Sequence, residues 1–231
     1  DKGAVTISLT GLSADDNYVL DMDGKVADIT GSPFTYPDLL NPGTHSMVIY
    51  NRAEGFTFDG RMARVNAPDG KSRADGASVI SLPGYLKTVS QEITVTADDT
   101  LRVNAVPMQR VRDLQLELEV TQGRPELIQS VTATLSGIAG IFDMEKGQTI
   151  GEPTSTVFSF TRDGSKLTAD ARLLGTMGDV QALVLDIVFT DGGRTQRTEV
   201  DLTEALADFN SGSLGRNSTS QKRVGANIQH S

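Results

Sequence analysis

The side chains that most often perform chemistry in proteins are scarce in this sequence. Its 231 residues include no cysteine and two histidines, His45 and His230. Without cysteine, the chain has no disulfide, no thiol nucleophile and no thiolate metal site. Neither histidine has a partner at the spacing of a metal site, which argues against His-based metal binding and against a Ser-His-Asp triad. His45 precedes an apolar run and is interpreted as a surface residue at the end of a strand.

Acidic residues form short clusters, and each cluster has two interpretations. The segment from Asp21 to Gly24 resembles the beginning of a calcium loop, but the glutamate that closes an EF-hand is missing, so we favour a hairpin turn. Asp15-Asp16 and Asp98-Asp99 are adjacent pairs, and neighbours on a strand point to opposite faces. They therefore predict solvated turns rather than the two facing carboxylates of a glycosidase. We expect no cofactor and no metal.

Aromatic residues could instead form a sugar-binding platform. All four tyrosines lie in the first half of the chain: Tyr18, Tyr36, Tyr50 and Tyr85. The alternative is that they are core side chains, because aromatic residues in strands usually pack inward.

The last segment, residues 211–231, is polar and mildly basic, a composition typical of a disordered tail. Val224 and Ile228 are its only bulky apolar residues after Leu214. Asn217-Ser218-Thr219 matches the short pattern of a glycosylation acceptor. Two interpretations remain open: a solvated tail, or an interaction segment that is held by a partner or a sheet edge and includes Val224 and Ile228.

The charge balance limits the classes of partner. The net charge of −9 and a pI near 4.7 disfavour nucleic-acid binding, which needs a basic surface. No apolar run approaches the roughly 20 residues of a membrane-spanning helix. No signal peptide precedes the first strand-like run, so we expect that the natural start has been trimmed.

Apolar alternation predicts an all-β fold, most clearly in a hairpin over residues 181–202. In that hairpin Asp191-Gly192-Gly193 forms the turn, and every second residue before it is apolar: Leu183, Leu185, Ile187 and Phe189. Similar runs between Gly, Asp, Asn and Pro predict strands over residues 4–9, 18–22, 25–29, 45–51, 62–67, 78–82, 92–97, 100–106, 111–120, 127–135, 156–161 and 167–174.

Three connecting segments carry finer expectations. We expect residues 92–97 and 100–106 to pair as a hairpin across Asp98-Asp99. Residues 136–151 are expected to form an irregular flap, and residues 203–209 a short helical segment with Thr203 as its N-cap. The inward-facing side chains expected in and beside these last two segments are Ile138, Ile141, Phe142, Leu202, Leu206 and Phe209.

The alternating pattern restarts after Pro107, where we place a domain boundary. The halves on either side match the size of ordinary β-sandwiches. We therefore predict an all-β protein with two tandem antiparallel β-sandwich domains, residues 1–107 and 108–210, followed by the tail at 211–231.

The order of several short motifs resembles a known family. Pro42 to His45 leads into Met47 to Asn51, and the later motifs are Leu135 to Gly140, Phe158 to Phe160, Leu173 to Gly175, the strand Leu183 to Phe189 with Asp191-Gly192, and Val200 to Thr203. Together, over about residues 3–210, they resemble the fimbrillin-associated anchor proteins (FimB-like) of Bacteroidales.

This resemblance implies a non-enzymatic cell-surface lipoprotein with two transthyretin-like sandwiches, located at the base of a fimbria or among its accessory subunits. Its partners would be fimbrial subunits, joined by adding a strand to an open sheet edge. An outer-membrane anchor would be a lipidated cysteine upstream of Asp1. Asp99-Thr100-Leu101 resembles the O-glycosylation motif of these bacteria, with Thr100 as the acceptor. No catalytic residue is expected.

Two other functions remain to be compared with the structural role. A surface adhesin or glycan-binding lipoprotein could use the same fold, and a concave cluster of aromatic side chains would favour it. A glycosidase would need two carboxylates about 5 to 10 Å apart in a cleft. The scarcity of His, Cys and Trp already weighs against an enzyme.

Overall fold

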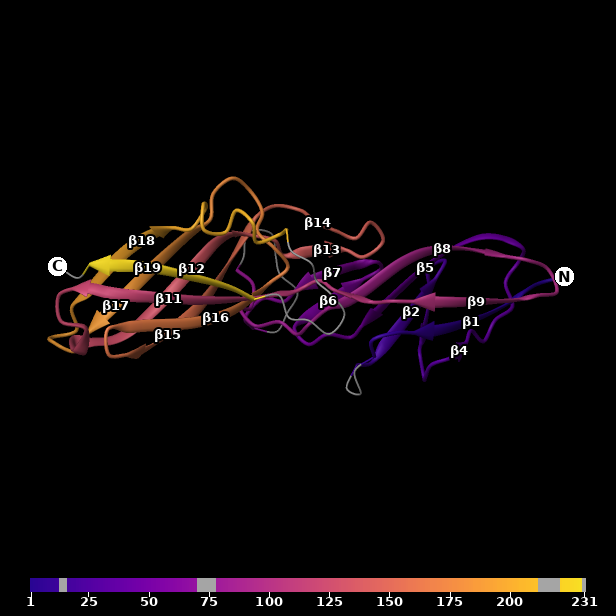
Figure 1. The fold of residues 1–231 in the computed structure, drawn as a ribbon, viewed down its shortest axis with the longest axis horizontal. Helices are drawn as coiled ribbons and strands as arrows, with labels where there is room; N and C mark the ends of the chain where they lie inside the picture. Colours follow the sequence, from indigo (N-terminus) through magenta and orange to yellow (C-terminus); the bar gives the residue numbers. More distant parts are fainter. Residues whose placement is uncertain (13–15, 70–77, 212–220, 230–231) are drawn as a thin grey trace.

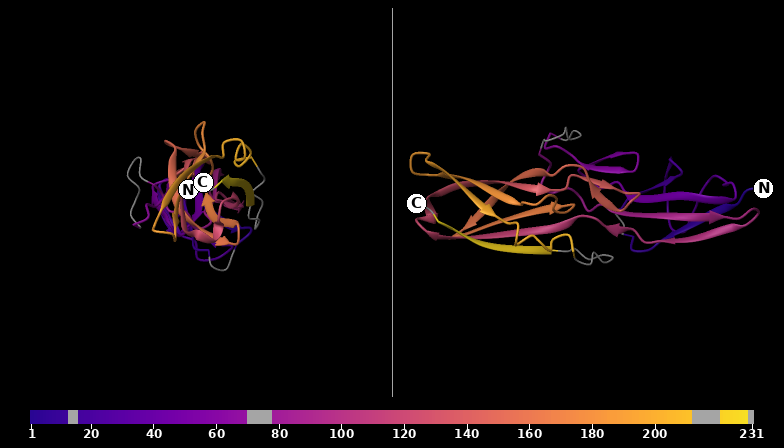
Figure 2. Two further views of the ribbon diagram at one scale, coloured as in Figure 1. Left: turned by 90° about the vertical axis from the view of Figure 1, so that its left-hand side faces the viewer. Right: turned by 90° about the horizontal axis from the view of Figure 1, so that it is seen from above.

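The computed structural model describes residues 1–12, 16–69, 78–211 and 221–229, the last of these as the backbone of one strand. The molecule is a long rod of β-strands, with the N-terminus at one end and the end of strand β19 (Gln221–Gln229) near the other (Figure 1). The end-on view in Figure 2 shows a narrow cross-section. Within the described residues, the one helical element is the short turn Pro125–Leu127, and no helix is long and apolar enough to cross a membrane.

Two sheets enclose an apolar core in the first half of the chain. Their strand orders are β10-β8-β5-β2-β3 and β4-β1-β9. Val5 and Ile7 of β1 pack in one cluster with Met47 and Ile49 of β5, and all four side chains are fully buried. The strands are β1 (Ala4–Leu9), β2 (Tyr18–Met22), β3 (Lys25–Asp28), β4 (Phe34–Thr35), β5 (Gly43–Asn51), β8 (Lys87–Val95), β9 (Thr100–Ala105) and β10 (Met108–Gln109).

Seven strands form the second half, in the order β18-β17-β12-β15-β16-β11-β19. Strand β15 pairs with β12 along most of its length and with β16 only at its end, from Thr161 to Asp163, so it connects the two layers of a sandwich. The predicted hairpin 181–202 is confirmed as β17 and β18. The bounds are β11 (Arg112–Gln122), β12 (Ile128–Ile138), β15 (Thr154–Asp163), β16 (Lys166–Leu173), β17 (Ala182–Phe189) and β18 (Thr195–Asp201).

A small sheet joins the two halves in the middle of the rod. It has the order β14-β13-β7-β6 and combines β6 (Phe56–Asp59) and β7 (Met62–Val65) with β13 (Ile141–Asp143) and β14 (Gln148–Ile150). The larger apolar core also crosses the joint, because it contains Val48 and Tyr50 of β5 together with Val111 and Leu114. The all-β sandwich fold is confirmed, and the domain boundary at Pro107 stays a prediction.

The predicted pairing of residues 92–97 with 100–106 is wrong. Strands β8 and β9 lie in different sheets, and β9 instead pairs in parallel with β1, with Ala4 opposite Thr100. Strands β11 and β19 are parallel as well, so the sheets are mixed rather than purely antiparallel. Alternation tells which face of a strand is buried, but it does not identify the neighbouring strand.

The inward-facing side chains of the flap and of the predicted helical segment are confirmed, but the helix itself is wrong. Five of the six apolar side chains expected to point inward are less than 6% exposed, and Ile141 is 7% exposed. Residues 136–151 are more regular than predicted, because β13 and β14 form a hairpin. Residues 203–209 form successive turns and no helix. Thr203 is therefore no helix N-cap, and its hydroxyl accepts a hydrogen bond from the Gln181 N–H instead (2.9 Å). The predicted strand 78–82 is a single bridge between Val79 and Thr156.

Candidate functional site

Strand β19, from the far end of the chain, lies along the edge of the second sandwich. It runs parallel to β11, and the two ladders match from Asp113 opposite Gln221 to Gln122 opposite Gln229. Residues 221–229 of the tail therefore lie at a sheet edge, and the role of Val224 and Ile228 as an interaction segment stays a prediction.

The register places the two apolar residues of the tail at particular positions along β11. Val224 lies opposite Leu116, and Ile228 lies opposite Val120. The side chains of Leu116 and Val120 are 0% and 6% exposed and belong to the larger core. The apolar residues of β19 therefore occupy the register positions at which β11 contributes to the core.

The opposite edge of the same sheet differs in chemistry. Strand β18 has no fully buried residue and carries Arg197, Glu199 and Asp201. Arg197 forms an exposed ion pair with Asp186 of β17 (2.8 Å). Charged edge strands discourage the addition of another strand. The β11 edge is therefore the better candidate for strand addition in this sandwich.

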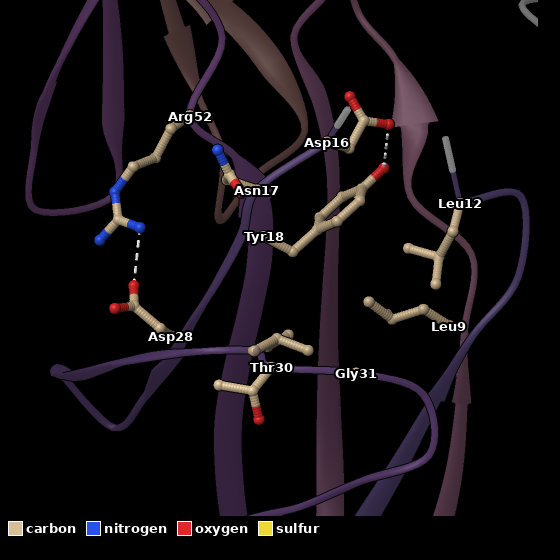
Figure 3. Close-up of a pocket in the computed structure, with 10 residues that line it drawn as sticks. Leu9, Leu12, Asp16, Asn17, Tyr18, Asp28, Thr30, Gly31 and Arg52 are labelled. Carbon is tan, nitrogen blue, oxygen red and sulfur yellow. Dashed lines mark hydrogen bonds and ion pairs between the residues drawn. The ribbon is translucent and has the colours of Figure 1, made fainter. Parts of the chain in front are cut away.

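An open pocket lies in the first half, between β2 and the segment that follows β3 (Figure 3). Its volume is about 830 Å³. Arg52 forms an ion pair with Asp28 (2.6 Å), and the Tyr18 hydroxyl donates to Asp16 (3.2 Å). Burial, and then the Asp16 carboxylate, raises the pKa of Tyr18. The phenol is therefore a neutral hydrogen-bonding group, and Leu9 adds apolar surface beside it (Figure 3).

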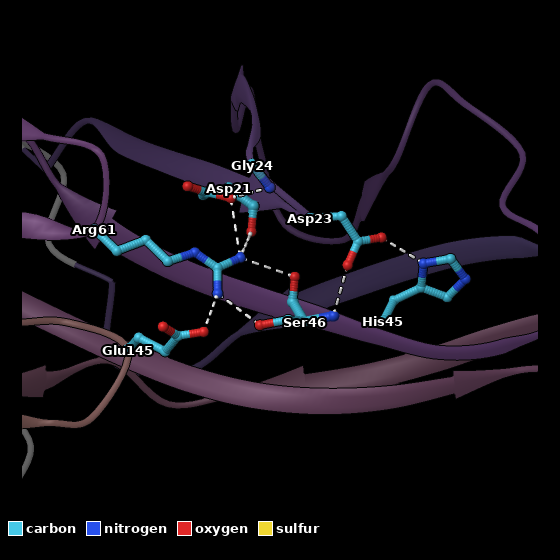
Figure 4. Close-up of polar contacts among 7 residues, drawn as sticks. All are labelled: Asp21, Asp23, Gly24, His45, Ser46, Arg61 and Glu145. Carbon is cyan, nitrogen blue, oxygen red and sulfur yellow. Dashed lines mark hydrogen bonds and ion pairs between the residues drawn. The ribbon is translucent and has the colours of Figure 1, made fainter.

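A polar network connects the β2–β3 turn, strand β5 and the small central sheet (Figure 4). Arg61 lies at its centre and donates to the Asp21 carboxylate (3.0 Å), the Ser46 carbonyl (3.0 Å) and Glu145 (3.0 Å). The side chains of Arg61 and Asp21 are 15% and 4% exposed. Asp21 and Glu145 outweigh the effect of burial, which alone would lower the pKa of Arg61, and raise it.

The network also decides between the two interpretations of the acidic segment at Asp21. Asp21 accepts from the Gly24 N–H (2.8 Å) and from Arg61, while Asp23 accepts from the Ser46 N–H (2.8 Å). Asp23 and Gly24 both have positive φ angles, 52° and 90°, as hairpin turns require. The hairpin turn is confirmed, and protein donors occupy the carboxylates that a calcium ion would need.

His45 lies near the start of β5, as predicted, but its side chain is only 14% exposed. Its Nδ1 faces the Asp23 carboxylate and its Nε2 faces the Asn41 carbonyl (2.6 Å). Both partners are acceptors, so the doubly protonated ring satisfies both contacts. The hydrogen bond to Asn41 and then the one to Asp23 outweigh burial and raise the pKa of His45. The interpretation as a plain surface residue is therefore wrong.

The remaining sequence candidates are dispersed. Tyr18, Tyr36 and Tyr50 are at most 6% exposed, which supports the core interpretation of the tyrosines over a sugar platform. Thr100 is exposed at the first position of β9, and its N–H donates to Asp99 (2.8 Å). The glycosylation pattern at residues 217–219 and His230 lie outside the described residues.

Comparison with known proteins identifies the fold. No protein-family model matches the chain, and no curated protein matches it. Several solved structures match nearly its whole length. Among them are a candidate adhesin from Bacteroides ovatus ATCC 8483 (TM-score 0.73, 16% identity, 99% of this chain and 93% of that one) and the fimbrial anchor protein Mfa2 from Porphyromonas gingivalis (TM-score 0.59, 12% identity, 97% and 91%). Candidate polysaccharide-binding proteins from Bacteroides thetaiotaomicron VPI-5482 also match (TM-score 0.59, 11% identity, 97% and 89%). At these identities the similarity shows a shared fold.

Proposed function

We propose that this chain is a non-catalytic structural protein of the cell surface, a fimbrial anchor or accessory subunit that binds fimbrial subunits through its sheet edges. The observation that supports this proposal most is the β11 edge, which is completed by a strand from the distant C-terminal segment. The shared fold with the fimbrial anchor Mfa2 agrees with it. The residue types give it chemical support, since the sequence is poor in catalytic side chains.

The physical basis is the hydrogen-bonding capacity of an open edge. Along β11, one side pairs with β16 and the other with β19. Without β19, the groups of β11 on that side would lack backbone partners, and an extended segment from another subunit could satisfy them. We propose that Val224 and Ile228 are the apolar anchors of such a segment. Main-chain bonds would then supply affinity, and these two side chains specificity.

A chain that ends at Asn210 is expected to bind a synthetic peptide of residues 219–231 with a Kd in the micromolar range, about −8 kcal/mol. Replacing Ile228 with serine in the peptide should weaken binding about tenfold or more, because about 1.5 kcal/mol of apolar burial is lost. Fluorescence anisotropy with a labelled peptide measures both values.

The matched control is the peptide with Asn227→Ser, since Asn227 lies opposite the half-buried Glu119 rather than a core residue. It should bind within about twofold of the parent peptide, a difference well below 1 kcal/mol. Should the shortened chain need the peptide to fold, refolding in its presence gives the same comparison. Equal losses for the two substitutions, or no binding by the shortened chain, would contradict the proposed role of this edge.

The cellular part of the proposal is tested by shearing fimbriae from the native bacterium and following the chain by immunoblot. Retention in the outer-membrane fraction supports an anchor, whose lipid attachment would belong to a segment upstream of Asp1. Release with the fimbriae supports an accessory subunit of the shaft or tip. Presence in cells without fimbriae, with no effect of its deletion on any fimbria, would refute the structural role. Mass spectrometry of the same material tests Thr100 as a proposed O-glycosylation site.

The second candidate function is a surface adhesin or glycan-binding lipoprotein. The pocket in Figure 3 favours it, since amide, hydroxyl and charged groups of Asn17, Thr30 and Arg52 line it beside apolar Leu9. Such mixed linings suit small polar ligands. Binding of the purified chain on a glycan array, reduced by Arg52→Ala, would support this function.

A further inference from the structure

The imidazole ring of His45 connects two segments that are separate in the sequence. Its Nδ1 lies 2.5 Å from a carboxylate oxygen of Asp23, in the β2–β3 turn (Figure 4). Its Nε2 lies 2.6 Å from the carbonyl oxygen of Asn41, just before β5 begins. A backbone carbonyl can only accept, and so can an ionised carboxylate. Both contacts therefore need an N–H from the ring, and only the protonated ring has two.

The Asp23 carboxyl group is held in its ionised form. Burial alone would raise its pKa, but the hydrogen bonds from His45 and from the Ser46 N–H outweigh burial and lower it. The positive charge of Arg61 acts in the same direction. Asp23 thus supplies no proton to the contact at neutral pH, and the proton must come from His45.

The other titratable side chains on the surrounding turns and strands are Lys2, Asp21, Lys25, Tyr36, Asp38, Arg61 and Glu92. Lys25 forms an ion pair with Asp38 (2.5 Å). Glu92 of β8 lies opposite Ser46, and so on the face of the sheet away from His45. Among the described residues, Asp23 is the one charged group in contact with the ring.

Loss of the second proton leaves the ring with a single N–H donor. The other ring nitrogen then presents a lone pair to an oxygen atom, which is a repulsive contact. A hydrogen bond to an ionised acceptor is stronger than one to a neutral acceptor. The neutral ring is therefore expected to keep its proton on Nδ1, towards Asp23, and to lose the bond to Asn41.

The contact that is lost lies beside a short backbone bridge. The Gly3 N–H donates to the Leu40 carbonyl, and the Leu40 N–H donates to the Gly3 carbonyl, both at 2.9 Å. Through this bridge, residues 36–41 cover the beginning of β1. Leu39 adds little to their attachment, since its side chain is 58% exposed. Loss of the bond to Asn41 should therefore loosen this segment at the N-terminal end of the rod.

We propose that His45 is a pH-dependent clamp, which holds residues 36–41 against the β2–β3 turn when its ring is protonated and releases Asn41 when the ring is neutral. The bonds to Asn41 and then to Asp23 outweigh burial and raise the pKa of His45 above its ordinary value of 6.5. The stabilisation is thus complete below 6.5 and is lost as the pH rises through the raised pKa of the folded chain. This proposal does not depend on the fimbrial role.

Nuclear magnetic resonance of the full chain between pH 5 and pH 9.5 tests the clamp. The His45 imidazole should titrate with a midpoint above 6.5, and the Leu40 and Asn41 amide shifts should follow the same midpoint. Protection of the Leu40 N–H from hydrogen exchange, corrected for the intrinsic rate, should fall at least about threefold between pH 6 and pH 9. The matched internal control is the Thr10 N–H, which donates to the Ala105 carbonyl just beyond the other end of β1 (3.0 Å) and should change by less than about twofold.

Two substitutions separate the ring from its partner. His45→Gln carries no charge at any pH, so protection of the Leu40 N–H should become independent of pH. Asp23→Asn should move the His45 midpoint down towards 6.5, because the ring loses its anionic acceptor. The control Asp28→Asn removes a carboxylate that is 65% exposed on β3, and it should shift that midpoint by less than about 0.2 pH units.

Three results would overturn the proposal: a His45 midpoint at or below 6.5, Leu40 protection that does not follow the titration of the ring, or an unchanged pH response in His45→Gln. If a variant fails to fold, the titration of the unaltered chain decides by itself, because it reports both the midpoint and the protection of Leu40.

Discussion

Replacing Arg61 with methionine is expected to destabilise the folded chain by about 3 kcal/mol or more. Methionine can fill much of the space of the arginine stem, but it removes the cation from the almost fully buried Asp21 carboxylate. A buried charge without a partner is far more costly than an intact buried pair. Urea unfolding, followed by circular dichroism, measures the loss as a lower transition midpoint.

The control for this substitution is Arg197→Met. It removes the ion pair between Asp186 and Arg197, whose side chain is 74% exposed, and should cost less than about 1 kcal/mol. A second test adds Asp21→Asn to the Arg61→Met chain. If the unpaired charge causes the loss, removing that charge should recover part of the stability. A cost for Arg61→Met no greater than that of the control would show that the network in Figure 4 contributes little.

Replacing Gly137 with alanine is the second change with a large expected effect, about 3 kcal/mol or more. Gly137 lies in β12 at a shift in register between Ser136 and Ile138, with φ at +76°. A Cβ atom there would lie 2.1 Å from the Val180 carbonyl oxygen. The left-handed backbone alone costs about 1–2 kcal/mol for a residue with a Cβ, and the collision with backbone adds to it.

Gly60→Ala separates these two contributions. Gly60 also has a positive φ, +56°, but an added Cβ would meet nothing within 4 Å. It should lose only about 1–2 kcal/mol in the same unfolding experiment. If both substitutions cost the same, the close approach of Val180 to β12 would have no energetic importance.

The sequence predicts strands well where one face of each strand is buried. The alternation of Leu183, Leu185, Ile187 and Phe189 is such a case, and all four are at most 2% exposed. Partners are harder to predict, because a strand with the correct buried face can lie beside several others. Asp98-Asp99 has the composition of a hairpin turn, but the chain crosses there from one sheet to the other. Leu202, Leu206 and Phe209 have helical spacing, yet residues 203–209 bury Leu206 and Phe209 through successive turns instead of a helix.

The candidate sites were only partly visible in the sequence. Val224 and Ile228 stand out in a polar tail, but nothing local indicates a parallel pairing with β11. Arg61 binds Asp21, which lies 40 positions before it in the sequence, and Glu145, which lies 84 positions after it. No short motif could therefore reveal this network.

The parallel arrangement of β11 and β19 has a mechanical consequence. Both strands point away from the centre of the rod, and the N-terminus and the end of β19 lie near its opposite tips (Figure 1). Tension between those tips pulls β19 outward along its own axis, while the opposing force acts on β11 at its first residues, near the centre of the rod. The ladder is thus loaded in shear, and its hydrogen bonds resist together instead of opening one after another like a zip. A force large enough to peel a hairpin apart would therefore leave β19 paired with β11.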